Sequence, residues 1–214
     1  MEEKNEVSEQ KLYYDPLSVS RRTLQKNHFV QEHDKLNLLS HLIKEHNYVN
    51  TIVIVKTKKS ADSVTTLLEE KGIKALALHA NKSKEERDDA VKLFNEKNCD
   101  VLITTDMILQ SYEFPSIKHM ISYNLPLEVQ HYYARLASMN EKGEGLALVS
   151  QEDEHIIDML EWAMKLEIPQ IEVDGFVPTP KPEVIQTGTK DRTKKPRHKK
   201  SKNDKMKNEK ISKA

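Results

Sequence analysis

Residues 51–72, TIVIVKTKKSADSVTTLLEEKG, contain one complete strand-and-helix unit. The β-branched run Ile52–Val55 is typical of a short strand that is covered on both faces. Apolar residues then recur at helical spacing through residues 61–68, and Ser60 is the predicted N-cap of that helix. Gly72 is placed where a helix commonly ends, because glycine accepts the left-handed conformation of a C-terminal cap. This unit predicts a buried parallel strand that leads into an amphipathic helix.

Similar units follow along the chain. A further helix is predicted before this unit, over residues 36–46. Ser83 and Glu86 form the capping-box pattern at the start of another helix, whose inner face carries Ala90 and Phe94. Further strands are predicted at 75–78, 101–103, 117–123 and 146–149, and further helices near 128–138 and 152–166. Strands and helices that alternate in this order predict an α/β fold with a doubly wound, mainly parallel sheet. In such sheets, ligand sites lie beyond the carboxyl ends of the strands.

Composition divides the chain of 214 residues into four segments. Residues 1–27 are interpreted as a polar N-terminal linker, 28–168 as the folded domain, 169–188 as an extended strap that contains prolines, and 189–214 as a disordered basic tail. The tail holds twelve of the 34 basic and three of the 34 acidic residues, which leaves 22 basic and 31 acidic residues in 1–188. The formal neutrality of the chain therefore conceals an acidic body and a basic tail.

Several classes of protein are disfavoured. No apolar run approaches the ~20 residues that cross a bilayer, and the acidic N-terminus lacks the apolar segment of a secretory signal, so we expect a cytoplasmic protein without a membrane partner. Cys99, the single cysteine, has no partner for an internal disulfide. His79, His119 and His131 fit no metal-ligand spacing, and no metal site is predicted.

Three further segments carry a family resemblance: residues 78–87 (LHANKSKEER), 100–106 (DVLITTD) and 121–126 (ISYNLP). Together they resemble the second, C-terminal RecA-like domain of DEAD-box RNA helicases. Residues 167–169 (EIP) and 175–176 (GF) are similar to the end of this domain in the bacterial RNA helicase E subgroup. Because the segment around residues 12–16 also resembles the linker between the two helicase domains, the resemblance implies that this sequence lacks the first domain.

The nucleotide motifs of the family are degenerate in this sequence. In the family, the second domain lends arginines to ATP hydrolysis from a motif that reads His-Arg-Ile-Gly-Arg-Thr-Gly-Arg. The matching residues 134–141 (ARLASMNE) keep the first arginine as Arg135, whereas Ser138 and Glu141 replace the two that face the triphosphate. The family motif Thr-Asp-x-Ala-Ala-Arg-Gly-x-Asp matches residues 105–113, where its arginine and glycine are lost and Glu113 replaces the last acid.

These substitutions predict that Glu113 and Arg135 are vestigial nucleotide-binding residues and that the chain contains no catalytic residue. None of the five glycines opens a P-loop, the glycine-rich turn that cradles phosphates. No cofactor is therefore expected, and ATP and Mg²⁺ would bind only if a partner supplied the P-loop domain.

The positions that contact the RNA backbone in the family are better retained. The amino end of a capped helix presents free amides and a positive dipole end to phosphate, and Lys82 adds charge there. The basic tail offers sequence-independent, salt-sensitive contacts. The predicted RNA-binding residues are Lys56, Thr57, Lys58, Asn81, Lys82, Ser83, Arg87, Thr105 and Asp106 in the body, and Lys194, Lys195, Arg197, Lys199 and Lys200 in the tail.

The favoured interpretation is a stand-alone, degenerate helicase C-terminal domain that binds RNA backbone or serves as an adaptor, without ATPase activity of its own. One alternative is half of a split RNA helicase, whose partner protein carries the first RecA-like domain. Another is a protein-interaction module that docks on an RNA helicase or an RNA-decay complex. A decaying gene fragment without a selected role is the fourth.

Overall fold

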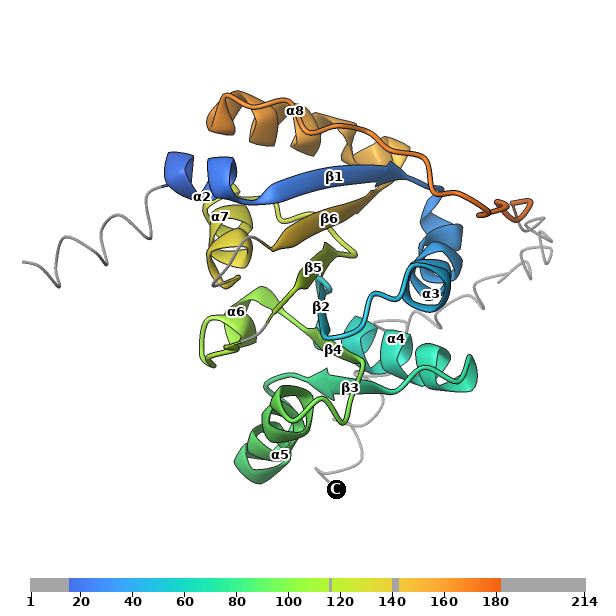
Figure 1. The fold of residues 1–214 in the computed structure, drawn as a ribbon, viewed down its shortest axis with the longest axis vertical. Coiled ribbons are helices and arrows are strands. Elements are labelled where there is room, and N and C mark those ends of the chain that lie inside the picture. Colours follow the sequence, from blue (N-terminus) through green and yellow to red (C-terminus); the bar gives the residue numbers. More distant parts are fainter. Residues whose placement is uncertain (1–15, 116, 140–142, 182–214) are drawn as a thin grey trace, which may run out of the picture. The chain divides into compact units, whose positions relative to one another are not determined.

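A single parallel sheet organises the part of the chain that the computed structural model describes, which comprises residues 16–115, 117–139 and 143–181. Within these residues, six strands lie in the order β1-β6-β5-β2-β4-β3, and every neighbouring pair is parallel (Figure 1). The strands are β1 (Leu24–Phe29), β2 (Thr51–Ile54), β3 (Ala75–Leu78), β4 (Val101–Thr104), β5 (His119–Ser122) and β6 (Glu144–Val149). The predicted α/β fold with a parallel sheet is confirmed.

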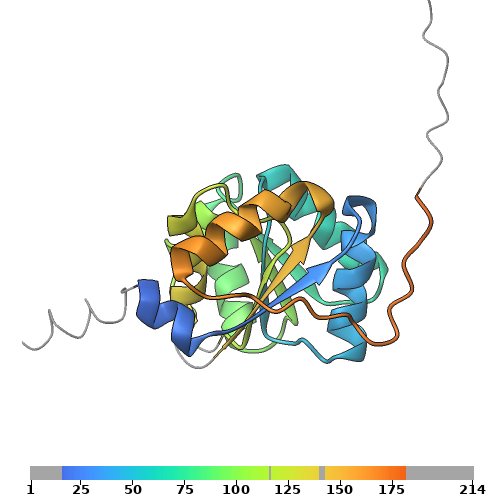
Figure 2. The same ribbon diagram turned by 90° about the horizontal axis from the view of Figure 1, so that it is seen from above.

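Helices cover both faces of this sheet. They are α2 (Pro16–Arg22), α3 (Lys35–Glu45), α4 (Lys58–Glu70), α5 (Lys84–Asn95), α6 (Asp106–Leu109), α7 (Val129–Ala137) and α8 (Glu154–Met164), with short 3-10 helices η1 (Glu32–Asp34) and η2 (Gln151–Asp153). Side chains from α3 and α4 pack on one face, and those from α2, α5, α6, α7 and α8 pack on the other. The resulting three layers are visible in Figure 2.

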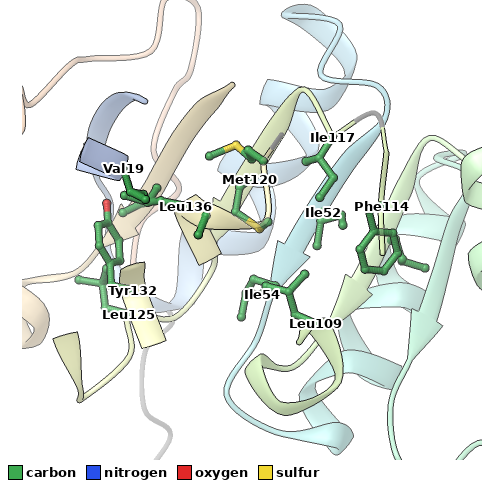
Figure 3. Packing of buried hydrophobic residues seen from close by; sticks show 14 of the residues in the cluster. Val19, Ile52, Ile54, Leu109, Phe114, Ile117, Met120, Leu125, Tyr132 and Leu136 are labelled. Atoms are coloured by element: carbon green, nitrogen blue, oxygen red, sulfur yellow. The ribbon is translucent and has the colours of Figure 1, made fainter. Parts of the chain in front are cut away.

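The four residues Ile52–Val55, in and directly after β2, are all apolar. Ile52 and Ile54 join the core cluster beneath α2 and α5–α8, where Figure 3 shows them near Phe114 and Met120. Val53 and Val55 point to the opposite face and join the cluster beneath α3 and α4. All four side chains are fully buried. Side chains of a strand alternate between faces, so a central strand that is covered on both sides must be apolar throughout.

The local signals at the helix ends are largely confirmed. Ser83 and Glu86 form the predicted capping box of α5. Gly72 adopts a positive φ of 77° directly after α4, which is the left-handed conformation that its position predicted. The prediction of Ser60 as the N-cap of α4 is wrong. Thr57 caps this helix, and its hydroxyl accepts a hydrogen bond from the amide of Ser60.

The interpretation of residues 1–27 as a linker is wrong for residues 16–27. Helix α2 and strand β1 belong to the folded domain, and β1 pairs with β6 along six residues. Strand β1 (LQKNHF) lacks apolar alternation because its buried side chains are polar. One of them, Gln25, donates to the carbonyl of Ser20 and accepts from the hydroxyl of Tyr132. Tertiary hydrogen bonds therefore satisfy a strand that a hydrophobicity pattern cannot detect.

Residues 169–180, within the segment predicted as an extended strap, pass the free edge of β1 at Asn27 and continue to η1. The amide of Asn27 donates to the carbonyl of Pro169, and the amide of Ile171 donates back to the carbonyl of Asn27. Farther along, Thr179 donates from both its amide and its hydroxyl to the buried carboxylate of Asp34. The strap thereby covers an edge strand whose exposed backbone would otherwise be open to pairing with other chains.

Candidate nucleic-acid interface

The predicted RNA-binding residues of the body lie where strands end. Residues 56–58 follow β2, residues 79–83 follow β3, and Thr105 and Asp106 follow β4. The strand registers place Ile54 and Leu78 each beside Thr104, so these three strands end level with one another. The sheet is parallel, and the three segments therefore meet at one carboxyl edge, where ligand sites of such sheets are found.

The loops after β2 and β3 are joined by a direct hydrogen bond. The ammonium group of Lys58 donates to the side-chain carbonyl of Asn81 at 2.7 Å, and both residues are exposed. Lys56 is exposed in the same loop, and its amide donates to the side-chain carbonyl of Asn124, which follows β5. Lys56, Lys58 and the half-buried Lys82 thus bring three positive charges to this edge.

The amino end of α5 lies at the same edge. The hydroxyl of Ser83 accepts from the amide of Glu86, and the carboxylate of Glu86 accepts from the amide of Ser83 at 2.7 Å. This bond from the Ser83 backbone lowers the pKa of Glu86 below its usual range. Within the described residues, the amides of Lys84 and Glu85 have no partner, and unpaired amides at a helix start attract anions. The carboxylate of Glu85 lies in the same turn and offsets part of that attraction.

His79 supports this turn from below, a role that the sequence analysis missed. Its ring is buried, and Nδ1 accepts from the amide of Asn81 at 3.3 Å. Nδ1 has no proton in that arrangement, so Nε2 carries it and donates to the carboxylate of Asp62 on α4 at 2.8 Å. The pair links α4 to the segment that presents Asn81 and Lys82. The spacing between His79 and Asp62 gives no signal in the sequence, because the contact depends on the packing of α4 against β3.

Arg87 points away from the lysine group. Its Nε donates to the hydroxyl of Tyr112 at 3.2 Å, and that hydroxyl donates to the carboxylate of Asp88 at 3.3 Å. The structure therefore does not bring the predicted set together as one cluster. Lys56, Lys58, Asn81 and Lys82 are joined by contacts between loops, whereas Arg87 belongs to a contact between α5 and the segment after α6.

Arg135 lies in the interior, and only 2% of the side chain is exposed. Its Nε and Nη2 donate to the two carboxylate oxygens of Asp106 at 2.6 and 2.8 Å. Its Nη1 donates to the hydroxyl of Ser122 and to the carbonyl of Asn124, both at 2.8 Å. These bonds tie α7 to α6 and to the end of β5. The predicted roles of Arg135 as a vestigial nucleotide ligand and of Asp106 as an RNA ligand stay predictions, and in this structure the two groups bind each other.

Glu113, the other predicted nucleotide residue, is exposed and lines a cleft of about 1100 Å³. Ala134 and Ser138 line the opposite wall. The structure thus places Glu113 and two positions of the degenerate arginine motif around one cleft. That Glu113 contacts a nucleotide there stays a prediction.

Part of the chain matches a known protein family. Residues 34–137 match the model of the helicase conserved C-terminal domain. Over these residues the chain is similar to a helicase C-terminal domain. The match begins just before α3 and ends with α7, so it includes the whole carboxyl-edge group described above and leaves β1, β6 and α8 of the same fold outside.

Solved structures of DEAD-box proteins share the fold of this helicase domain. One DEAD-box protein, from the hyperthermophile Methanococcus jannaschii, is 25% identical with a TM-score of 0.66, over 72% of this chain and 43% of that protein. Escherichia coli SrmB, in a complex with regulator of ribonuclease activity A, is 22% identical with a TM-score of 0.68, over 74% and 95%. Saccharomyces cerevisiae Dbp5, bound to RNA and ADP BeF3, is 23% identical with a TM-score of 0.66, over 71% and 42%. This chain therefore spans less than half of the first and third of these proteins.

The other predicted residues lie in the tail and at the start of α6. The five tail positions, Lys194 to Lys200, lie outside the described residues. Thr105 is half-buried at the start of α6. Among the described residues, no group of three His, Cys, Asp or Glu side chains suits a metal ion. No helix in the described part of the chain has the length and apolar character needed to cross a membrane.

Proposed function

We propose that this helicase C-terminal domain binds the RNA backbone at the carboxyl edge of its sheet, without supplying the phosphate-binding arginines of an ATP site. The observation that carries the proposal is the bond between Lys58 and Asn81, which joins two exposed loops beside the capped start of α5. Three lysines and unpaired helix amides converge there, and both kinds of group favour phosphate. In agreement with the proposal, Dbp5 of the same fold has been solved with RNA.

The charges around Glu113 argue against the binding of a nucleotide. In the segment that matches the family's arginine motif, two arginine positions are described: Arg135 is buried against Asp106, and the other is Ser138, across the cleft from the exposed carboxylate of Glu113. A carboxylate that faces a phosphate raises the energy of the bound state. ATP is therefore expected to leave the affinity for RNA unchanged.

Replacing Lys58 and Lys82 together with alanine tests the RNA-binding edge. We expect about a tenfold loss of affinity for single-stranded RNA at low salt, and a log–log salt slope that is shallower by about 1.4, because each lysine neutralises one phosphate and a single strand gives about 0.7 per phosphate. Fluorescence anisotropy of labelled oligo-RNA with the full chain measures both quantities.

The matched control is Lys92→Ala, which removes an exposed charge from the last turn of α5, away from the edge. This variant should keep the wild-type slope to within experimental error. A second arm replaces the five tail residues, Lys194 to Lys200, with glutamine. If the tail variant loses all binding while the edge variant binds like wild type, the tail alone binds RNA and the proposal for the edge is wrong.

A second candidate function, protein docking, is favoured by Trp162. Ile156, Leu160 and Met164 on α8 are buried, but Trp162 on the same helix is 84% exposed. SrmB, of the same fold, has been solved with a protein regulator. Exposed tryptophan is common at protein interfaces, where its burial contributes much of the affinity.

Trp162 is the only tryptophan of the chain and therefore reports its own environment. In the free protein we expect the emission of a water-exposed indole and efficient quenching by iodide. A bound protein partner that covers α8 should move the emission to shorter wavelength and protect the indole from quenching. An emission already at short wavelength in the free protein would contradict the exposed position. RNA serves as the control ligand, since binding at the carboxyl edge should leave the spectrum unchanged.

A further inference from the structure

The cleft beside Glu113 has walls of distinct chemistry. The segment Leu109–Pro115 forms one wall, and the outer face of Gln130–Ser138 on α7 forms the other. At its floor lie the buried side chains of Val19, Leu109 and Phe114. Figure 3 shows these three residues within the core cluster that extends from α2 to the strands. The cleft thus combines an apolar floor with a polar rim, the usual composition of a binding site.

The hydroxyl groups at the rim direct their protons away from the cleft. Ser138 donates to the carbonyl of Ala134 at 2.8 Å, and Ser111 donates to the carbonyl of Met107 at 3.1 Å. Tyr112 donates to the carboxylate of Asp88 at 3.3 Å. A hydroxyl that donates elsewhere keeps lone pairs with which it accepts. These three rim residues therefore offer acceptors to a ligand and have already used their donors.

The charge at the rim also favours a ligand that donates hydrogen bonds. Glu113 is exposed, and its ionised carboxylate only accepts hydrogen bonds. Among the described residues that line the cleft, there is no lysine, arginine or histidine. Across residues 1–188, acids outnumber bases by 31 to 22, which extends the negative potential beyond the cleft. An anionic ligand would meet the Glu113 carboxylate without a cation in the described lining, whereas a cationic ligand rich in N–H groups would find an ion-pair partner and hydrogen-bond acceptors.

We propose that this cleft binds an arginine side chain presented by a peptide segment of a partner protein. The guanidinium group would pair with Glu113 and stack on the rings of Tyr112 or Tyr133, both of which line the cleft. The three methylenes of the arginine would lie over the apolar floor, because long basic side chains bury their stems while the charged head stays at the polar rim. Arginine fits better than lysine, since its planar and weakly hydrated head stacks on aromatic rings. The site is separate from the lysines of the carboxyl edge and does not depend on RNA binding.

The test uses the full chain and short labelled peptides made of glycine and serine around one central residue. That residue is arginine, citrulline, lysine or glutamate, and citrulline keeps the shape of arginine without its charge. We expect the arginine peptide to bind about five- to tenfold more tightly than the citrulline peptide, which corresponds to one exposed ion pair together with one cation–π contact. Lysine should fall between them, and glutamate should not bind.

Two variants locate the binding. Glu113→Gln should abolish the difference between the arginine and citrulline peptides, and Ala134→Phe should fill the cleft and weaken both. Glu70→Gln is the matched control, because it removes an exposed carboxylate from α4 on the opposite face of the sheet. Thermal unfolding midpoints equal to that of the wild type confirm that the variants are folded.

Three results would overturn the proposal. Equal binding of arginine and citrulline peptides to the wild type would show that charge plays no part. Displacement of the arginine peptide by ATP at a similar concentration would mark the cleft as a nucleotide site. Free arginine that competes as well as the peptide would identify a small molecule, and not a peptide segment, as the occupant.

Discussion

Replacing Arg135 with methionine is expected to lower the free energy of unfolding by about 3 kcal/mol or more, because it removes one partner of a buried ion pair. The carboxylate of Asp106 would lose two bonds, and Ser122 and the carbonyl of Asn124 would each lose a donor. Asp106 is 22% exposed and recovers some hydration, which places the effect toward the lower end of the range for buried pairs. Urea unfolding followed by circular dichroism measures the loss.

A double-mutant cycle with Asp106→Asn isolates the pair. We expect a coupling energy of about 2 kcal/mol, since residues in direct contact show coupling up to about 3 kcal/mol. The matched control is Arg87→Met, a half-buried arginine with one hydrogen bond to Tyr112, for which a loss of about 1 kcal/mol is expected. If Arg135→Met costs no more than Arg87→Met, the bonds around Arg135 do not stabilise the fold as argued.

The second large effect concerns Glu144, at the amino end of β6. His119, then Lys26 and Tyr48, bind its carboxylate and hold its pKa at about 2, against the opposing effect of burial. A carboxyl pKa that is lower in the folded state stabilises the protein above the unfolded value of 4.5, and this contribution is lost as the pH falls from about 4.5 to about 2. This lowering of the pKa corresponds to about 3 kcal/mol in the free energy of unfolding at neutral pH. Solvent screens the interaction only weakly, because 16% of the Glu144 side chain is exposed.

Glu144→Gln removes this titration. At pH 7 we expect the variant to be less stable than the wild type by about 3 kcal/mol, and at pH 3 by about half as much, because wild-type stabilisation has by then declined. Urea unfolding at the two pH values tests the expectation. Asp34 and Asp153 also have lowered pKa values, so the comparison between wild type and variant is needed to separate Glu144 from them. A deficit that is the same at both pH values would contradict the assigned pKa.

Some elements of the fold could be predicted from local residue patterns, whereas others depend on contacts between distant segments. The central strands were recognisable because both their faces are buried, as Ile52–Val55 illustrates. Strand β1 was missed because it buries the polar residues Gln25, Asn27 and His28, of which Gln25 and His28 form side-chain hydrogen bonds with other segments. The hydrophobicity of β1 reveals neither its place in the sheet nor its cover by the strap.

The candidate sites likewise combine features that follow from local sequence with features that depend on contacts between distant segments. The helix start at Ser83 was predicted because a capping box is local, spanning only the interval from Ser83 to Glu86. The burial of Arg135 was not predicted, because its partners Asp106, Ser122 and Asn124 come from two other parts of the chain. The exposure of Trp162 was not predicted, because its neighbours at helical spacing include both apolar residues, Met159 and Leu166, and charged residues, Asp158 and Lys165.

The sequence by itself determined the α/β class and the central strands, because both follow from residue type at short, regular spacing. Tertiary structure decided which of the remaining polar groups face solvent. It buried Arg135 against Asp106, joined Lys58 to Asn81, and turned the hydroxyl protons of Ser111 and Ser138 away from the cleft. The physical reason is that a hydrogen bond or an ion pair satisfies its groups wherever the chain brings them together. Separation along the sequence does not constrain such pairs, whereas helical and strand periodicity is set by neighbours.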